Sequence, residues 1–163
     1  MYKKCEKADQ KLMAAWAADC AERVLQLFEK VCPKDDRPRN AIAQCREWAR
    51  TGVFSMAVIR GASLAAHAAA REAPNEAARC AARAAGQAVA TAHVSQHAFG
   101  AAYYALKAIA AADPANAEAN VAKEWEWEVG RAPENLRDET LQRVVIKSTK
   151  TGPEIKIFKD ADF

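Results

Sequence analysis

The chain has few of the residues from which catalytic loops and covalent frameworks are built. It contains only six glycines and six prolines among 163 residues, which leaves little material for a glycine-rich loop around a phosphate group. No nucleophile elbow of the Gly-x-Ser-x-Gly type and no aromatic signature of an RNA-binding domain is present. The sequence therefore contains no specific enzyme motif, and we expect a protein without enzymatic activity and without a cofactor.

Cysteine is present in a number and a spacing that argue against structural cross-links. The five cysteines are odd in number, and no two of them are separated by two residues as zinc-binding pairs are. Three lie within helical patterns on apolar faces, namely Cys20, Cys45 and Cys80. We expect these to be buried free thiols in a reducing cytoplasm.

Long apolar runs and a strong charge of one sign are also missing. No window approaches the 18 or so uncharged apolar residues of a membrane-spanning helix, and the first residues lack the apolar stretch of a signal peptide. The 24 basic and 21 acidic residues leave a net charge of only +3, without a basic stripe. A cytoplasmic protein that binds neither membrane nor nucleic acid is the expectation.

What the chain does have is alanine, at 40 of 163 positions. Alanine is the strongest helix former and a very small side chain, so helices rich in it can pack with their backbones close together. The composition predicts an all-α fold, a bundle of six to seven helices over residues 1–143. Two β-branched segments in residues 144–163 predict a short C-terminal tail resembling a β-hairpin, packed either on the bundle or on a partner.

Apolar periodicity and breaking residues locate the individual helices. Asp9, Ser55, Asn75 and Ser95 are candidate N-caps, and Gly52 is a candidate left-handed C-cap. The predicted helices span about 8–31, 38–51, 55–73, 75–92, 95–112 and 115–129, with a short seventh after Pro133.

The three histidines are the first candidates for chemistry. His93 and His97 have the i, i+4 spacing that places two imidazoles on one helix face, and His67 from the third helix and Asp19 from the first are candidates to join them. The Val94-Ser95 break between the two histidines weakens this arrangement. A polar network inside the bundle is the interpretation that we favour over a metal site.

Charged residues of the first helix and the following loop are the next candidates. Asp19 and Arg23 are placed for an i, i+4 ion pair; alternatively, Asp19 points inward and pairs with Arg37, Arg39 or a histidine. In the loop, Arg37 and Arg39 are suited to clamp an acidic group or to form a contact surface. Asp36 is equally suited to cap the second helix.

An acidic and aromatic block, residues 124–128, contains two tryptophans. Trp125 is expected to be buried. Trp127 lies about 200° further round the helix, where it either anchors a partner or, as we slightly prefer, holds the C-terminal hairpin.

Several ordered blocks together resemble the small all-α Imm-5-like immunity proteins. The likeness extends over about residues 10–112 and, more loosely, over the part after Trp125. It rests on Ala15–Leu25, Asp35–Ile42, Trp48–Arg50, Ser63–Arg71 and Ala84–Val94. The resemblance implies a protein that binds and blocks a bacterial toxin, and it draws attention to Asp19, Arg23, Asp36, Arg37, Arg39, His67, His93 and His97.

The sequence thus favours a protein-binding module, most simply an immunity-type inhibitor that acts by occlusion. Arg37, Arg39 and acidic helix ends would orient the partner, and Trp127 would anchor it. One alternative is a small-ligand or metal-binding protein or enzyme that uses His67, His93, His97 and Asp19. A second is a helical module that forms homo-oligomers through its alanine faces.

Overall fold

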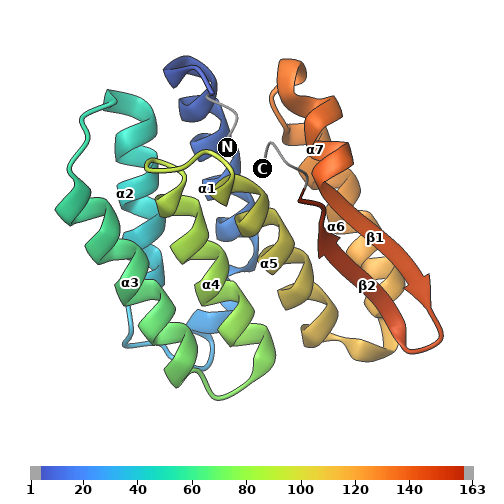
Figure 1. Cartoon of the computed structure of the whole chain (residues 1–163). Helices are drawn as coiled ribbons and strands as arrows, with labels where there is room; N and C mark the ends of the chain where they lie inside the picture. The colour runs from blue at the N-terminus through green and yellow to red at the C-terminus, as the bar shows by residue number, and fades with distance from the viewer. Residues whose placement is uncertain (1–4, 160–163) are drawn as a thin grey trace.

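The structure, a computed structural model, describes residues 5–159 and confirms the predicted helical fold with a C-terminal hairpin. Within this part of the chain, seven α-helices are followed by two antiparallel strands (Figure 1). The helices are α1 (Lys7–Glu29), α2 (Arg37–Thr51), α3 (Met56–Glu72), α4 (Glu76–Ala90), α5 (His97–Ala112), α6 (Ala117–Arg131) and α7 (Arg137–Arg143).

Two of the four predicted N-caps are confirmed, and so is the predicted C-cap. The Ser55 hydroxyl and the Asn75 side-chain carbonyl each accept a hydrogen bond from the backbone three residues on, and Gly52 adopts the left-handed conformation (φ 68°). The other two are wrong. Asp9 lies inside α1, and the Ser95 hydroxyl donates to the Gln96 side chain rather than capping a helix.

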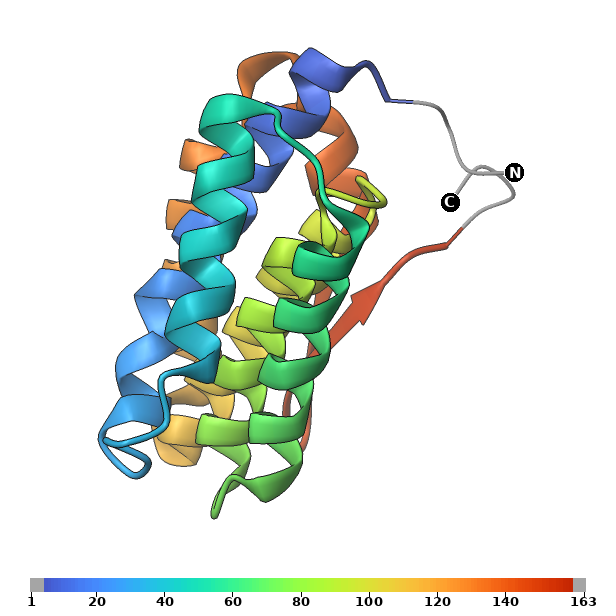
Figure 2. The ribbon, with the colours of Figure 1, turned by 90° about the vertical axis from the view of Figure 1, so that its left-hand side faces the viewer.

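The six long helices form two layers (Figure 2). One layer contains α2, α1 and α6, and the other contains α3, α4 and α5. Helix α4 lies at the middle of the molecule, where it packs against α1, α2, α3 and α5. This arrangement agrees with the close packing of helices that the alanine content predicts.

The centre of α4 consists almost entirely of small side chains. Buried positions occur all along it, and most are alanine: Ala78, Ala81, Ala82, Ala84, Ala85 and Ala88, with Cys80, Gly86 and Val89. Small side chains on one helix let the axis of its neighbour approach. The large side chains of the core come from the surrounding helices, for example Phe28 and Trp16 from α1 and Phe99 and Leu106 from α5.

The hairpin continues the α3–α4–α5 layer beyond α5. Strand β1 (Val144–Thr149) pairs with β2 (Gly152–Ile157), so that Val144 is opposite Ile157 and Thr149 is opposite Gly152. The pair packs on α5 and α6, and its inward side chains Ile146 and Ile155 contact the core. A two-stranded hairpin alone is marginal in water, so this apolar contact with the bundle supports it.

Two glycines create space for polar side chains between the helices of the second layer. A Cβ atom on Gly86 of α4 would lie 2.9 Å from the imidazole of His67 on α3. A Cβ atom on Gly100 of α5 would lie 2.7 Å from the side-chain oxygen of Gln87 on α4. His67 and Gln87 therefore occupy places that exist only because the facing residue has no side chain.

We expect the substitution Gly86→Ala to destabilise the fold by about 1–2 kcal/mol. The added methyl group collides with a ring that is packed between two helices, and relief requires the ring or the helix to shift. Urea unfolding of the purified protein measures the change.

Gly61 on α3 provides the matched control. Nothing lies within 4 Å of a Cβ atom built there, so Gly61→Ala should stabilise the protein by roughly 0.5–1 kcal/mol through helix propensity alone. Equal effects of the two substitutions would contradict the close contact between α3 and α4.

Candidate functional site

The three histidines predicted as candidates line one hollow between α3, the end of α4 and the start of α5. We call this hollow the histidine pocket; its volume is about 340 Å³. Its other lining residues are apolar or small, apart from one cation: Met56, Ile59, Arg60, Ser63, Leu64 and Ala90. The break between α4 and α5 places His93 in a turn and His97 at the start of α5, so the two do not share one helix face.

Burial favours the neutral form of two imidazoles of this pocket, those of His67 and His97. Burial lowers the pKa of His67, and the positive charge of Arg83 and the neighbouring His97 lower it further. Burial also lowers the pKa of His97, helped by His93 and Lys159. The Nδ1 atom of His67 is buried without a hydrogen-bond partner among the described residues.

His97 is fixed by one short hydrogen bond. Its Nδ1 atom lies 2.6 Å from the side-chain oxygen of Gln87, and because that oxygen only accepts, Nδ1 carries the proton. Of the predicted polar network between helices, the structure contains this pair, whereas the Nδ1 atom of His67 has no partner among residues 5–159.

Asp19 does not join the histidines, and the predicted Asp19–Arg23 ion pair is wrong. The carboxylate of Asp19 pairs instead with Arg46 of α2 at 2.9 Å, because α2 lies alongside α1 and offers a nearer cation. Within residues 5–159, no three His, Cys, Asp or Glu side chains are grouped so that they could hold a metal ion. The geometry therefore does not support the metal alternative.

Arg23 and Trp127 interact with each other across α1 and α6. The guanidinium of Arg23 pairs with Glu124 at 2.8 Å and lies 4.2 Å from the centroid of the Trp127 ring. Arg131 lies 5.1 Å from the same ring. Trp127 thus contributes to the contact of α6 with α1; the expected role in holding the hairpin is taken by the core contacts of Ile146 and Ile155.

The two arginines at the start of α2, Arg37 and Arg39, are also paired within the chain. Arg37 pairs with Asp35 at 2.6 Å and with Glu72 at 2.5 Å, and Arg39 pairs with Glu29 at 2.6 Å. Asp36 occupies the predicted N-cap position of α2, but its side chain makes no capping hydrogen bond; the neighbouring Asp35 accepts the hydrogen bond from the backbone N–H of Arg37. Arg37 and Arg39 hold the ends of α1, α2 and α3 together, and their charges are largely neutralised.

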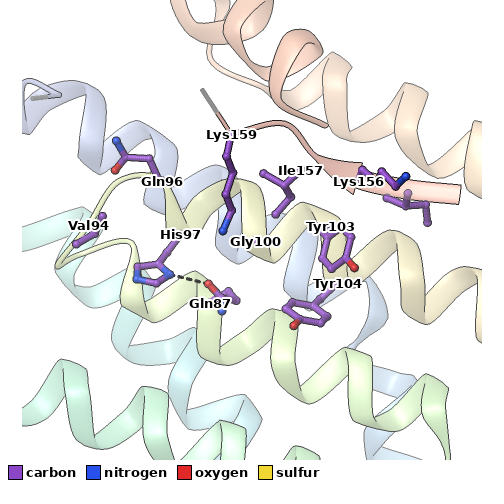
Figure 3. Close-up of a pocket in the computed structure, with 11 residues that line it drawn as sticks. Gln87, Val94, Gln96, His97, Gly100, Tyr103, Tyr104, Lys156, Ile157 and Lys159 are labelled. Atoms are coloured by element: carbon purple, nitrogen blue, oxygen red, sulfur yellow. Dashed lines mark hydrogen bonds between the residues drawn. The ribbon is translucent and has the colours of Figure 1, made fainter. Parts of the chain in front are cut away.

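A second hollow lies between α5 and β2 and shares His97 with the first (Figure 3). We call it the tyrosine pocket; its volume is about 510 Å³. Tyr103 and Tyr104 of α5 form one wall with their rings edge to face, 5.0 Å between centroids. Ile155 and Ile157 of β2 form another, and Lys159 extends from the end of the hairpin toward Gln87 and His97 (Figure 3).

A group of exposed apolar side chains that the sequence patterns did not predict lies at the corner between α2 and α3. Val53 is 77% exposed, Leu64 is 56% exposed, and Phe54 is 44% exposed. We call this group, completed by the half-exposed Met56 and Val58, the α2–α3 apolar corner. Met56 and Leu64 also line the histidine pocket, so the pocket opens within the apolar corner.

A signal for this corner was present in the sequence. Val53 and Phe54 directly follow Gly52, the glycine that ends a helix, at a place where a connecting loop is normally polar. Two large apolar residues there indicate either a buried loop or a contact surface, and only the structure distinguishes the two.

Most of the chain matches the sequence pattern of one known protein family. Residues 3–135 match the family described as Imm-5 like putative immunity protein. The chain belongs to this immunity family. No curated protein and no solved structure matches the chain.

The match extends from the start of the bundle to the turn before α7, so the histidine pocket and the apolar corner lie inside the family region. The hairpin, and with it one wall of the tyrosine pocket, lies outside it. Among the described helices of this family member, none combines the length and the apolar character needed to cross a membrane.

Glu128 of α6 is the least satisfied polar side chain in the family region. It is completely buried, and neither carboxyl oxygen has a hydrogen-bond partner among residues 5–159. Burial raises the pKa of Glu128 well above its usual value, and the neighbouring Glu124 carboxylate adds to the shift while Arg23 opposes it. The side chain is therefore a source of instability whenever it must ionise.

We expect Glu128→Gln to stabilise the protein increasingly as pH rises. Because the pKa of Glu128 is raised on folding, its favourable contribution is complete below the unfolded pKa, 4.5, and is lost as pH rises through the folded pKa. The difference between variant and native protein should be small near pH 4 and on the order of 1–3 kcal/mol above neutrality.

Chemical unfolding at a series of pH values measures this difference. Glu126→Gln is the control, because Glu126 is exposed on the same helix and its replacement should leave stability nearly unchanged. A difference for Glu128→Gln that does not vary with pH would show that the carboxyl group is not buried as described.

Proposed function

We propose that this chain is an immunity protein that binds a protein toxin and blocks it by occlusion. Membership of the immunity family supports a protein partner. The observation that carries the assignment of a surface is the α2–α3 apolar corner, because five of the nine exposed large apolar side chains of the described residues lie between residues 53 and 64. Clusters of this kind are typical of surfaces that another protein covers.

The histidine pocket gives this surface a recess into which a side chain of the partner can insert and contribute much of the binding free energy. Interface residues that dominate affinity usually insert into a recess surrounded by contacts that exclude water. The pocket has apolar walls from Met56, Ile59 and Leu64, with polar imidazoles behind them. An apolar side chain of the toxin would fill it and exclude water from the surrounding corner.

Arg60 makes this surface favour a partner that carries a negative charge. It lines the histidine pocket and is exposed, and it forms no ion pair with a described residue, in contrast to Arg23, Arg37 and Arg39. We therefore propose that the contact surface of the toxin carries a carboxylate beside its apolar anchor. The three paired arginines then act within the fold rather than in steering the partner.

The experiment is a binding measurement with the purified toxin encoded beside the gene for this chain. We expect a stoichiometric complex in which the activity of the toxin is inhibited. The double substitution Phe54→Ser and Leu64→Ser should weaken the complex at least about a hundredfold, because central apolar anchors dominate interface energies.

Leu141→Ser is the matched control. Leu141 is 48% exposed, and it lies on α7, which packs against α6 and β1 on the opposite side of the bundle from α2 and α3 (Figure 1). This variant should therefore bind the toxin as the native protein does. Absence of binding by the native protein would contradict the immunity role, and full binding by the double variant would contradict the assigned surface. If the corner instead joins two copies of the chain, sedimentation will show a dimer that the double substitution dissociates.

A further inference from the structure

A groove between α1 and α2 continues the α2–α3 apolar corner along the other layer of the bundle. The two helices lie side by side (Figure 2), and the groove between them has a volume of about 610 Å³. Lys11, which lines the groove, places its ammonium 3.8 Å from a Cβ atom built on Gly52. Gly52 directly precedes Val53 and Phe54 of the corner, so one end of the groove lies beside the corner.

The floor of this α1–α2 groove is apolar and consists mainly of small side chains. Ala8 and Ala15 of α1 and Ala49 of α2 line it, together with Leu12, which is 50% exposed. The distance from Ala8 to Ala15 is two turns of α1, about 10 Å. Small side chains let another helix approach closely, and Leu12 between them offers it an apolar contact.

The rim of the groove is positively charged. The charged residues that line it are all cations, namely Lys11, Arg46 and Arg50. The two arginines pair with carboxylates of α1 and α2, whereas Lys11 forms no ion pair with a carboxylate of residues 5–159. The groove therefore keeps a net positive charge at Lys11.

A second ammonium group lies at the same end of the groove. Lys7 donates a hydrogen bond to the carbonyl oxygen of Gly52 at 3.2 Å, at the end of α2. The carbonyl groups at a helix end carry only a partial negative charge, so they attract Lys7 and Lys11 without neutralising them. A carboxylate of a partner would complete this end of the groove.

The backbone around the groove decides which kind of segment fits. The walls are two helices whose own N–H and C=O groups are bonded along each helix, so the groove offers no strand edge to an extended segment. A strand on the alanine floor would lose water from backbone groups that find no partner there. A helix satisfies its own backbone and places apolar side chains on one face with charged ones beside them.

We propose that the toxin contacts the α1–α2 groove with an acidic amphipathic helix. The apolar face of that helix lies on Leu12 and the alanines, and its carboxylates lie beside Lys7 and Lys11. This inference rests on the proposed immunity function. It extends the contact surface from the apolar corner onto the other layer and states what kind of segment the toxin supplies there.

Two substitutions test the groove in binding measurements with the purified toxin encoded beside the gene for this chain. Lys11→Glu should weaken the complex at least about tenfold and reduce its sensitivity to salt, because a like charge then faces the carboxylates. Leu12→Ser should weaken it about tenfold through loss of an apolar contact. The matched controls are Lys150→Glu, at an exposed lysine in the hairpin turn, and Leu141→Ser; both should bind as the native protein does.

Hydrogen exchange of the toxin in the complex with the native protein tests the kind of segment. We expect slower exchange in a helix of the toxin that carries at least two acidic residues beside its apolar face. Unchanged affinity in either groove variant, or protection of the toxin only in strands or loops, would overturn the inference. So would a dimer of the toxin-free protein that Leu12→Ser dissociates, because a second copy would then occupy the groove.

The same measurements separate this inference from the proposed function. If the native protein binds no toxin, the immunity role fails and the groove assignment fails with it. If the native protein binds, the corner variant weakens the complex and the groove variants do not, then only the groove assignment fails.

Discussion

The close approach of α4 to its four neighbours is the constraint on which the rest of the structure depends. An α-helix surrounded on nearly all sides needs small side chains if its neighbours are to reach it, and α4 provides them at most of its buried positions. Large side chains in the core are consequently displaced to the outer helices, among them Trp16, Phe28 and Phe99. The space around α4 is therefore filled by large side chains that extend from the neighbouring helices toward it.

This arrangement also determines where polar groups can be buried. Between helices in close contact, a side chain as large as an imidazole fits only opposite a residue without a Cβ atom, as His67 does at Gly86 and Gln87 at Gly100. Two such places occur side by side on α3, α4 and α5, and the histidine pocket and the tyrosine pocket share His97. His67, His97 and Gln87 thus lie in one layer, whereas the buried Glu128 lies on α6 in the other. The charged residues elsewhere, such as Arg37 and Arg39, mainly join helix ends.

Local sequence signals predicted the elements of the fold well and the partners of individual side chains poorly. Alanine content, proline positions and the caps Ser55 and Asn75 are local properties, and the helices and the hairpin followed from them. Asp19 pairs with Arg46 rather than Arg23 because the choice of partner depends on which helix lies alongside, and helical spacing does not contain that information. The apolar corner was missed for a related reason. The residues Val53 and Phe54 would be the same in a loop that is buried, so the sequence does not show that they are exposed. Their exposure results from the position of α3 at the edge of its layer (Figure 1).

The most direct test of the central claim is native-state hydrogen exchange of the backbone amides. Amides whose opening requires global unfolding exchange most slowly. If the small side chains of α4 make it the tightly packed centre, the amides from Ala81 to Val89 should exchange most slowly in the molecule, with an opening free energy equal to that of global unfolding. Exchange in α4 as fast as in the edge helix α3 would contradict this account.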